Sequence, residues 1–521
     1  MENPTWLSLL PPLLAILLAI ITRKVVPSLG LGVLSAAFIA NGWQPLKSIA
    51  HAFTAYLWPS IIDPYHFSVI IFAMLLGAMI MVVAYSGGAA ALANVFTKLA
   101  HSARSSQFAT ACMGLAIFFD DYASALIVGS TMRPITDSFK VSREKLAYLV
   151  DSTTAPIAAL FVSTWIGYEI GIIGDALAGT GFTMDAFSIF VVSIPARFYA
   201  IFAIIFVFMI VISKRDFGPM LAAEKRARTT KQLVAADTSN AAIENKLNEM
   251  RPASHWKNAA LPILVTIFVT ILVLYLSGRN AVTAAGGELL FRNILSNANT
   301  SKALVMAAFA GLLTALWLPL RHKHFSPQEA ISAVLKGFKT MLPGLVIIIL
   351  AWSLGAATKD LKTAAFVVSL LSDAISSAWL PMLIFVFGSF ISLATGSSWG
   401  TMAILMPIVV PLAWTLSQKS GMSLDQAHDL LALSVSSVLA GSIWGDHCSP
   451  ISDTTILSSI ASSCNHIDHV RTQMPYALAV GFVTIVAGYL PVALGASISF
   501  ALLLGIVAMG AIVLLFGKKT D

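Results

Sequence analysis

The chain has 521 residues, of which 57% are hydrophobic and only 11% are charged, whereas soluble globular proteins have about 25% charged residues. This composition excludes an ordinary soluble protein and indicates an integral membrane protein. The formal net charge of +7 does not indicate a nucleic-acid partner, because the basic residues fall mostly in the connections between apolar runs, as the positive-inside rule predicts.

Apolar runs along the chain predict its membrane spans, because about 20 consecutive apolar residues cross a bilayer as a helix. In chain order these runs lie at 5–22, 25–41, 66–85, 146–173, 186–213, 258–277, 303–321, 341–358, 428–463, 474–492 and 495–516. One polytopic helical body is therefore expected in place of several soluble domains.

Two further apolar runs, 107–135 and 380–416, are interrupted midway, the first by Asp120-Asp121 and the second by 396–398. Each is predicted to be a re-entrant helical hairpin, which enters and leaves the membrane on the same side. Basic residues flank both ends of the first hairpin and place both ends in the cytoplasm. Only Lys419 lies close to the second hairpin, so both of its ends can be outside.

The basic clusters also predict the orientation of the chain. The longest polar connection, 214–257, is rich in Lys and Arg and is predicted to be a cytoplasmic linker. Following the spans from this linker places Lys518 and Lys519 in the cytoplasm and the N-terminus outside. The compact loops indicate a bacterial inner membrane.

Three short motifs recur in the same order in both halves of the chain and indicate an internal repeat. The matched pairs are 84–89 with 351–356, 120–124 with 397–401, and 154–158 with 448–452. A short amphipathic stretch, of the kind that lies along a membrane surface, also occurs in each half, at 46–57 and 327–338. The charge pattern places the first stretch outside and the second inside, which predicts repeats of inverted topology.

The predicted fold is an all-α polytopic membrane protein with two inverted-topology repeats of five spans each, re-entrant helical hairpins, unwound helices and one extra C-terminal span. Its parts are the first repeat at 1–213, with the hairpin 107–135 and the broken helix 146–173; the cytoplasmic linker 214–257; the second repeat at 258–492, with the hairpin 380–416 and the broken helix 428–463; and the extra span with a cytoplasmic C-terminus at 493–521.

Four helix interruptions fall at positions that the repeat relates to each other. They are predicted at 119–122, 152–156, 395–399 and 445–450. An interruption inside a membrane is tolerated only where the freed backbone lines a cavity or is buried in protein. In inverted-repeat transporters such breaks meet near the midplane and coordinate substrate and ions. One central site is therefore expected.

The residues at these breaks supply oxygen ligands that suit a hard cation. A charged side chain at bilayer depth costs roughly 2.5 to 3.5 kcal/mol, so acidic residues there usually mark an ion or substrate path. The candidate ion- and proton-binding residues are Asp120, Asp121, Ser152, Thr153, Thr154, Ser397, Ser398, Asp446, His447, Ser449, Ser452 and Asp453, with Asp151, Thr395, Thr401 and Thr454 as additional candidates. Sodium is assigned to Asp121, Asp446 and Asp453.

A proton and a cation would compete at this site, because several carboxylates that share a dry cavity cannot all stay ionised. His447 could relay protons, since imidazole titrates near neutral pH, or could make a structural hydrogen bond instead. The pair Asp120-Asp121 also suits an ordinary helix cap. Asp151 could pair with Arg143 or Lys145 near the cytoplasmic surface.

Three stretches resemble the NhaC-type sodium/proton antiporter family. They read GDHCSPISDTT at 445–455, TGSSWGT at 395–401 and FFDDY at 118–122. The similarity runs over nearly the whole chain. It implies inverted repeats, two re-entrant hairpins, two unwound helices and elevator-type movement of a transport domain against a scaffold that forms a homodimer in the lipid bilayer.

The function expected on these grounds is secondary active exchange of sodium for protons by alternating access. The alternative is a sodium- or proton-coupled exchanger of a small organic acid or amino acid, of which malate/lactate exchange is an example in the family. Arg133 and Arg197 lie nearer the span ends, so no arginine is expected to clamp a carboxylate substrate. Backbone amides at half-helix ends could still bind an anion.

An enzyme is not expected, because the sequence has no nucleotide loop, zinc motif or nucleophile elbow. No cofactor is expected beyond sodium and protons as transported or coupling ions. The expected partners are the lipid bilayer, a second copy of the chain and a small organic anion or amino acid under the alternative function.

Overall fold

The computed structural model describes residues 5–22, 24–161, 163–235, 254–286, 288–289, 294, 297–322, 326–366 and 376–520. Within these residues the chain is predominantly helical, and nine helices are long and apolar enough to cross a membrane. The prediction of a multi-pass helical membrane protein is confirmed. Much of the predicted linker 214–257 lies outside the described residues.

The first half of the chain forms mostly short helices. They are η1 (Trp6–Leu9), α1 (Leu10–Thr22), α2 (Val25–Ala40), α3 (Pro45–His51), η2 (Ala52–Leu57), α4 (Trp58–Ile62), α5 (Pro64–Tyr85), α6 (Gly88–Thr97), α7 (Ala103–Ala116), α8 (Asp121–Ser138), α9 (Arg143–Asp151), α10 (Ala155–Ala158), α11 (Thr164–Leu177), α12 (Ala186–Ser193), η3 (Ile194–Ala196) and α13 (Phe198–Ser213). The runs predicted as full spans at 5–22 and 25–41 form shorter apolar helices.

The second half contains most of the long helices. After β1 (Arg215–Asp216) and α14 (Gly218–Thr230) come α16 (Lys257–Ala284), α18 (Thr300–Arg321), α19 (Pro327–Asp360), η4 (Ser377–Trp379), α21 (Leu380–Thr395), α22 (Ser398–Lys419), α23 (Leu424–Cys448), α24 (Asp453–Ala461), α25 (His466–Val483), η5 (Thr484–Tyr489), α26 (Leu490–Ala493), α27 (Ile498–Phe516) and β2 (Lys518–Lys519). The antiparallel pair β1–β2 ties the C-terminus to the start of the linker.

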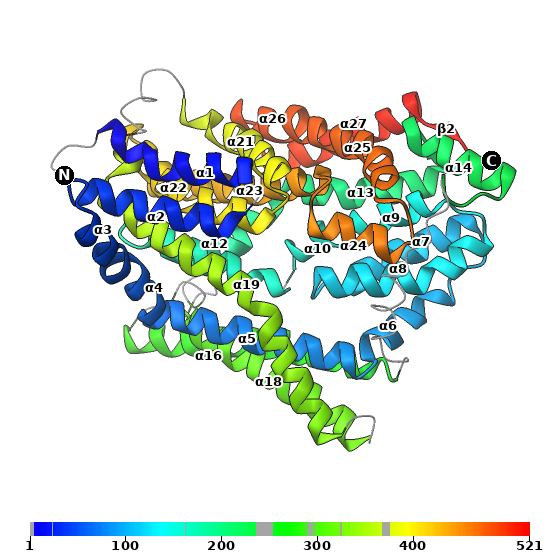
Figure 1. The fold of residues 1–521 in the computed structure, drawn as a ribbon, viewed down its shortest axis with the longest axis horizontal. Helices are drawn as coiled ribbons and strands as arrows, with labels where there is room; N and C mark the ends of the chain where they lie inside the picture. The colour runs from blue at the N-terminus through cyan, green and yellow to red at the C-terminus, as the bar shows by residue number, and fades with distance from the viewer. Residues whose placement is uncertain are drawn as a thin grey trace.

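The helices form two groups that α19 connects (Figure 1). Helices α5, α16 and α18 form a lower group, in which α18 packs on α16 and α5. Helix α19 crosses from the upper group and packs on α5, α2 and α22. Helices α1 to α3 lie at one end of the long axis, and α14 and β2 lie at the other.

Both predicted hairpins are helix–break–helix structures. Helices α7 and α8 are separated by 117–120, and α21 and α22 are separated by only Gly396 and Ser397. Gly396 takes a φ of +64°, in the left-handed region that glycine adopts without strain, and so permits the tight turn. The first hairpin lies toward the α14 end of the molecule and the second toward the α1 end (Figure 1).

The broken helices differ in detail from the prediction. The second break lies at 449–452, because α23 continues through Gly445, Asp446 and His447 and ends at Cys448. Polar residues do not end this helix, since their side chains are buried among partners from other helices. The first broken helix consists of three described helices, with one break at 152–154 and a second between the end of α10 at Ala158 and the start of α11 at Thr164.

A further prediction of helix extent was wrong. The amphipathic stretch 327–338 is not a separate surface helix, because α19 runs without a break from its Ser326 capping box to Asp360. The run 186–213 is apolar enough for one span, and it bends by 46° where α12–η3 meets α13 beside Arg197.

Candidate functional site

A cavity of about 280 Å³ lies where the two hairpins, α11, α19 and the second broken helix meet. Four carboxylates from both halves of the chain line it. The lining residues that belong to the predicted site are Asp120, Asp121, Ser397, Ser398, Asp446, Asp453 and Thr454. The structure therefore brings together polar residues from three of the four predicted breaks.

The tip of the first hairpin places two of these carboxylates. Asp120 caps α8 by accepting a hydrogen bond from the Ala123 amide (2.7 Å), as the capping alternative proposed. Asp121 accepts hydrogen bonds from the indole Nε1–H of Trp165 (3.2 Å) and from the Tyr122 amide (3.0 Å). Both carboxylates are buried in the protein and line the cavity, so the helix cap and the site coincide.

The second half of the chain supplies the other two carboxylates. Asp446 lies in the last turn of α23, and Asp453 is the first residue of α24. The turn at Gly396 packs directly on the break between these helices, since a Cβ atom on Gly396 would lie 2.8 Å from the Ile451 carbonyl oxygen. The hydroxyl of Tyr122 donates to Asp453 across the cavity (3.2 Å) and so links the two halves.

Aromatic side chains form one wall of the cavity. Trp165 and Trp399 line it and meet edge to face, with ring centroids 6.2 Å apart. Tyr168 stacks on Trp399 from behind, at 4.4 Å, and donates its hydroxyl to the Trp399 carbonyl. These aromatic residues were not predicted as part of the site, although Trp399 lies inside the TGSSWGT stretch.

Helix ends surround the cavity. Helices α8, α11, α22 and α24 all begin there, so their partly positive N-terminal ends meet the four carboxylates. The C-terminal end of α23 also reaches the cavity at Asp446. None of the described residues that line it is Lys, Arg or His. The charged side chains of this lining are thus all acidic.

A second, largely apolar cavity of about 220 Å³ adjoins the first. The two share Asp120, Tyr122, Thr340 and Met341. The second cavity extends between α5, α8 and α19 as far as Tyr85, at the end of α5. The polar cavity is therefore continued by an apolar one along α5 as far as Tyr85.

Several predicted site residues lie outside the first cavity. Their hydroxyl groups form hydrogen bonds within the protein, mostly to backbone carbonyl groups. Thr153 donates to the Leu149 carbonyl (2.7 Å), Thr154 to the Asp151 carbonyl (2.8 Å) and Thr401 to the Ser397 carbonyl (2.9 Å). Ser449 donates to the Leu393 carbonyl (2.9 Å), and Ser452 pairs with the Thr454 hydroxyl (3.0 Å). Thr395 is buried near the carbonyl of Ser392. These side chains hold the breaks in shape.

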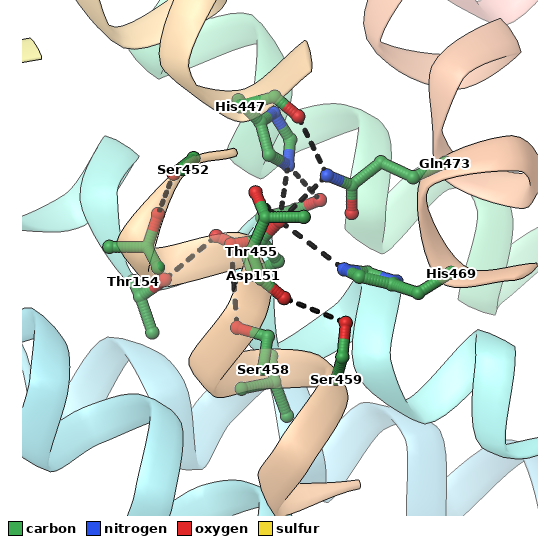
Figure 2. A network of polar contacts seen from close by, with 12 residues as sticks. Asp151, Thr154, His447, Ser452, Thr455, Ser458, Ser459, His469 and Gln473 are labelled. Atoms are coloured by element: carbon green, nitrogen blue, oxygen red, sulfur yellow. Dashed lines mark hydrogen bonds and ion pairs between the residues drawn. The ribbon is translucent and has the colours of Figure 1, made fainter. Parts of the chain in front are cut away.

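A separate buried cluster forms around Asp151 (Figure 2). The carboxylate accepts hydrogen bonds from Gln473 (2.6 Å) and Thr455 (3.0 Å) and lies 3.4 Å from His469 Nε2. His447 Nε2 lies 3.9 Å from the same carboxylate and is hydrogen-bonded to Ser152 (3.1 Å). The sequence analysis included Asp151, Ser152 and His447 but missed His469 and Gln473.

The predicted alternative for Asp151 was wrong. Arg143 pairs with Asp137 (3.1 Å), and Lys145 pairs with Asp216. The ion-pair partners that the structure gives Asp151 are both histidines. Asp151 is therefore held within the protein by neutral donors and imidazole rings.

Arg197, which was expected nearer a span end, lies at the N-terminal end of α13. Arg197 is fully buried at the bend between α12 and α13, where it pairs with Glu169 (3.0 Å) and donates to the Ala159 and Phe190 carbonyls. It lies outside the lining of the polar cavity. No arginine is among the described residues that line this cavity.

The three carboxylates assigned to sodium line one cavity but do not converge tightly. Among the described residues no group of three or more His, Cys, Asp or Glu side chains is placed to hold a metal ion. Asp121, Asp446 and Asp453 thus remain candidate ligands on three separate elements, with the hydroxyl residues Ser397, Ser398 and Thr454 in the same lining.

Residues 158–494 match the model of the Na+/H+ antiporter family. The chain belongs to this family. The matched region contains the second hairpin and Asp446 and Asp453, so the antiporter match covers the elements that build one side of the cavity. This membership makes the chain a membrane transporter rather than an enzyme.

Two relatives extend the comparison. An uncharacterized protein of Haemophilus influenzae is 34% identical over 529 residues, which cover 99% of this chain and 96% of that protein. The malate-2H(+)/Na(+)-lactate antiporter of Bacillus subtilis is 24% identical over 182 residues, which cover 34% of this chain and 36% of that protein.

The fold resembles that of a solved transporter. The structure of MtrF from Neisseria gonorrhoeae, described as an antimetabolite efflux pump, aligns with a TM-score of 0.51 at 14% identity. The alignment covers 90% of this antiporter-family chain and 85% of the other. At this identity the likeness concerns the fold alone.

Proposed function

We propose that this protein exchanges sodium for protons by alternating access, with the 280 Å³ cavity as the ion site. The observation that carries the proposal is that Asp120, Asp121, Asp446 and Asp453 line one cavity without a basic residue among its described lining. Such a site favours a cation, and repulsion among its carboxylates favours a proton when the cation leaves.

The candidate sodium ligands are Asp121, Asp446 and Asp453, with Ser397, Ser398 and Thr454 as neutral oxygen donors in the same lining. Asp120 shares the site and caps α8. Protonated carboxylates release sodium to one side, and sodium displaces the protons on the other. This competition couples the two ions when the site changes sides only with sodium or protons bound.

The experiment uses proteoliposomes that contain a pH dye, to which sodium is added outside with no organic solute present. The unmodified protein should change the internal pH, and Asp446→Asn should abolish the change. Asp429→Asn is the matched control, since Asp429 lies on the same helix but is exposed and outside the cavity lining. Equal activity of all three proteins would refute the proposal.

The proposed movement is of the elevator type, in two inverted repeats with the N-terminus outside and the C-terminus in the cytoplasm of a bacterial inner membrane. Supporting features are the placement of the two hairpins toward opposite ends of the molecule (Figure 1) and the position of α14 and β2 at the end that carries the basic linker. A homodimeric scaffold belongs to the same proposal.

Cysteine labelling tests the movement. Ser398→Cys, in a protein without its three native cysteines, should react from one membrane face without sodium and from the other face with saturating sodium. Labelling from a single face under all conditions would contradict an elevator. Light scattering in detergent tests the homodimer, which a monomeric mass would exclude.

A second candidate function is exchange of a small organic acid or amino acid coupled to sodium or protons. Four helix N-termini at the cavity favour an anionic group, and a volume of about 280 Å³ exceeds what a bare sodium ion fills. The similarity to a malate/lactate antiporter points the same way. Sodium-gradient-driven uptake of labelled carboxylates and amino acids would support this function, and no uptake across the panel would count against it.

A further inference from the structure

The Asp151 cluster (Figure 2) lies outside the lining of the polar cavity, and residues adjacent to it in sequence belong to that lining. Asp151 is at the end of α9 and only 1% exposed. Its neighbours come from three other helices: His447 from α23, Thr455 and Ser458 from α24, and His469 and Gln473 from α25. The carboxylate is therefore surrounded on all sides by side chains that donate hydrogen bonds or can carry a proton.

The cluster has an open position for a proton. His469 Nε2 faces Asp151, whereas its Nδ1 atom is buried and has no hydrogen-bond partner within the described structure. A buried nitrogen without a partner is uncommon, because desolvation of an unsatisfied polar group is costly. When Nε2 carries the hydrogen that Asp151 accepts, Nδ1 holds a free lone pair that a proton can occupy.

His447 helps to position the carboxylate from α23. Its Nδ1 is hydrogen-bonded to the Tyr199 hydroxyl (2.6 Å), and its Nε2 faces Ser152 and Asp151. An imidazolium at His469 would pair with the buried Asp151 carboxylate, which has no Lys or Arg among its ion pairs in the described structure. One added proton would thus balance one buried negative charge.

Neighbouring residues connect this cluster to the cavity. On α23, Asp446 lines the cavity and the next residue, His447, faces Asp151. On α24, Asp453 and Thr454 line the cavity and the next residue, Thr455, donates to Asp151. A shift of either helix end on sodium binding changes both sites together.

We infer that Asp151 and His469 form a second proton-binding site, separate from the cavity, whose occupancy is coupled to sodium binding through the ends of α23 and α24. The inference rests on the proposed sodium/proton exchange and deepens it. Besides the protons that sodium displaces from the cavity carboxylates, one proton is taken up at Nδ1 of His469 and is released when sodium binds.

Other titratable groups face the cluster from the helices packed against it. They are Tyr148 on α9, Tyr199 on α13, Asp446 and Cys448 on α23, and Tyr476, whose ring packs on Tyr148, on α25. Helix α24 contributes hydroxyl groups, and its carboxylate Asp453 lies in the cavity.

The test measures protons released into weakly buffered solution when sodium is added to the purified protein in detergent, together with sodium binding and the pH profile of exchange in proteoliposomes. His469→Gln keeps an amide N–H for Asp151 but cannot take up a proton. It should retain sodium binding, release at least about twofold fewer protons, and move the midpoint of the pH profile by about one unit, a tenfold change in proton affinity.

His428→Gln is the matched control, because His428 lies on α23 like His447 but at the far end, against Thr183 and Phe182. It should behave as the unmodified protein. Asp151→Asn, which keeps the size of the side chain, should reduce proton release as His469→Gln does. An unchanged midpoint and unchanged proton release in folded, sodium-binding His469→Gln would overturn the inference. Absence of any sodium-dependent proton movement in the unmodified protein would instead refute the proposed function.

Discussion

The hydroxyl of Tyr122 donates a hydrogen bond to the carboxylate of Asp453 at 3.2 Å, across 331 positions of sequence. Tyr122 belongs to the first hairpin and Asp453 to the second broken helix, so this bond joins the two halves of the chain at the cavity. A cation that takes Oδ2 of Asp453 as a ligand competes with the tyrosine hydroxyl for that oxygen.

Replacing Tyr122 with Phe removes this competition. A hydrogen bond of this kind contributes about 0.5 to 1.5 kcal/mol net, so we expect the sodium concentration for half-maximal exchange to fall by up to about tenfold. The measurement is the sodium dependence of proton movement in proteoliposomes. Tyr275→Phe is the control, since Tyr275 is exposed on α16. An unchanged sodium dependence would mean that Asp453 is not a sodium ligand.

The turn at Gly396 should tolerate no side chain. Alanine there would have to adopt the left-handed backbone conformation, which costs about 1 to 2 kcal/mol. Its Cβ atom would also lie 2.7 Å from Ile451 Cγ1. Gly421→Ala has nearly the same φ, +62°, but nothing within 4 Å of the added Cβ. We expect Gly396→Ala to lower the melting temperature and the exchange rate much more than Gly421→Ala. Equal effects would show that the contact between the turn and the break is unimportant.

Arg197 and Glu169 should stabilise the protein only when both are present. Both side chains are fully buried, and removal of one leaves the other charge unbalanced, which costs about 3 to 5 kcal/mol. Arg197→Met and Glu169→Met should each destabilise the protein strongly, while the double variant should cost less than the sum. Thermal unfolding of the four proteins in detergent measures the coupling. Additive losses would exclude a direct interaction.

Docking of α14 against α9 should weaken as pH rises. Glu224 of α14 is fully buried and accepts hydrogen bonds from the Ser142 amide (2.8 Å) and hydroxyl (2.7 Å). Burial raises the pKa of this carboxyl, and nearby Asp216 raises it further. The folded state thus holds the proton more tightly than the unfolded chain, so the stabilising contribution is present below the ordinary glutamate pKa and is lost as pH rises through the raised value.

Glu224→Gln keeps the acceptor oxygen without the charge. At neutral pH we therefore expect slower amide hydrogen exchange over 218–230 in Glu224→Gln than in the unmodified protein, and little difference near pH 4. Glu329→Gln, at the exposed start of α19, serves as the control. Faster exchange in Glu224→Gln at neutral pH would contradict this account of the pKa.

The sequence predicted much of the fold because its signals are local. Long apolar runs mark the spans, and a glycine or an Asp-Asp pair in a long run marks each hairpin turn. The position of the second break was harder to predict from the sequence, because Asp446 and His447 look like residues that end a membrane helix. They remain helical since Asp446 faces a cavity and His447 faces Asp151, and both environments depend on other helices.

The candidate site was predicted in part for the same reason. Acidic residues at breaks are conspicuous in an apolar sequence, and the four in the cavity were all named. Trp165, His469 and Gln473 were missed, because an aromatic or amide side chain within a helix has no local signal that separates a site from a core. The burial of Arg197 beside Glu169 was not predicted, because it depends on contacts between helices.

The most direct test of sodium/proton exchange at the cavity is uphill transport. Proteoliposomes with an acidic interior are placed in neutral buffer with labelled sodium at equal concentration on both sides, and sodium inside is measured over time. We predict accumulation of sodium above the outside concentration with the unmodified protein and with Asp429→Asn, and none with Asp446→Asn. Sodium that equilibrates but never accumulates, or accumulation that survives Asp446→Asn, would contradict exchange through these carboxylates.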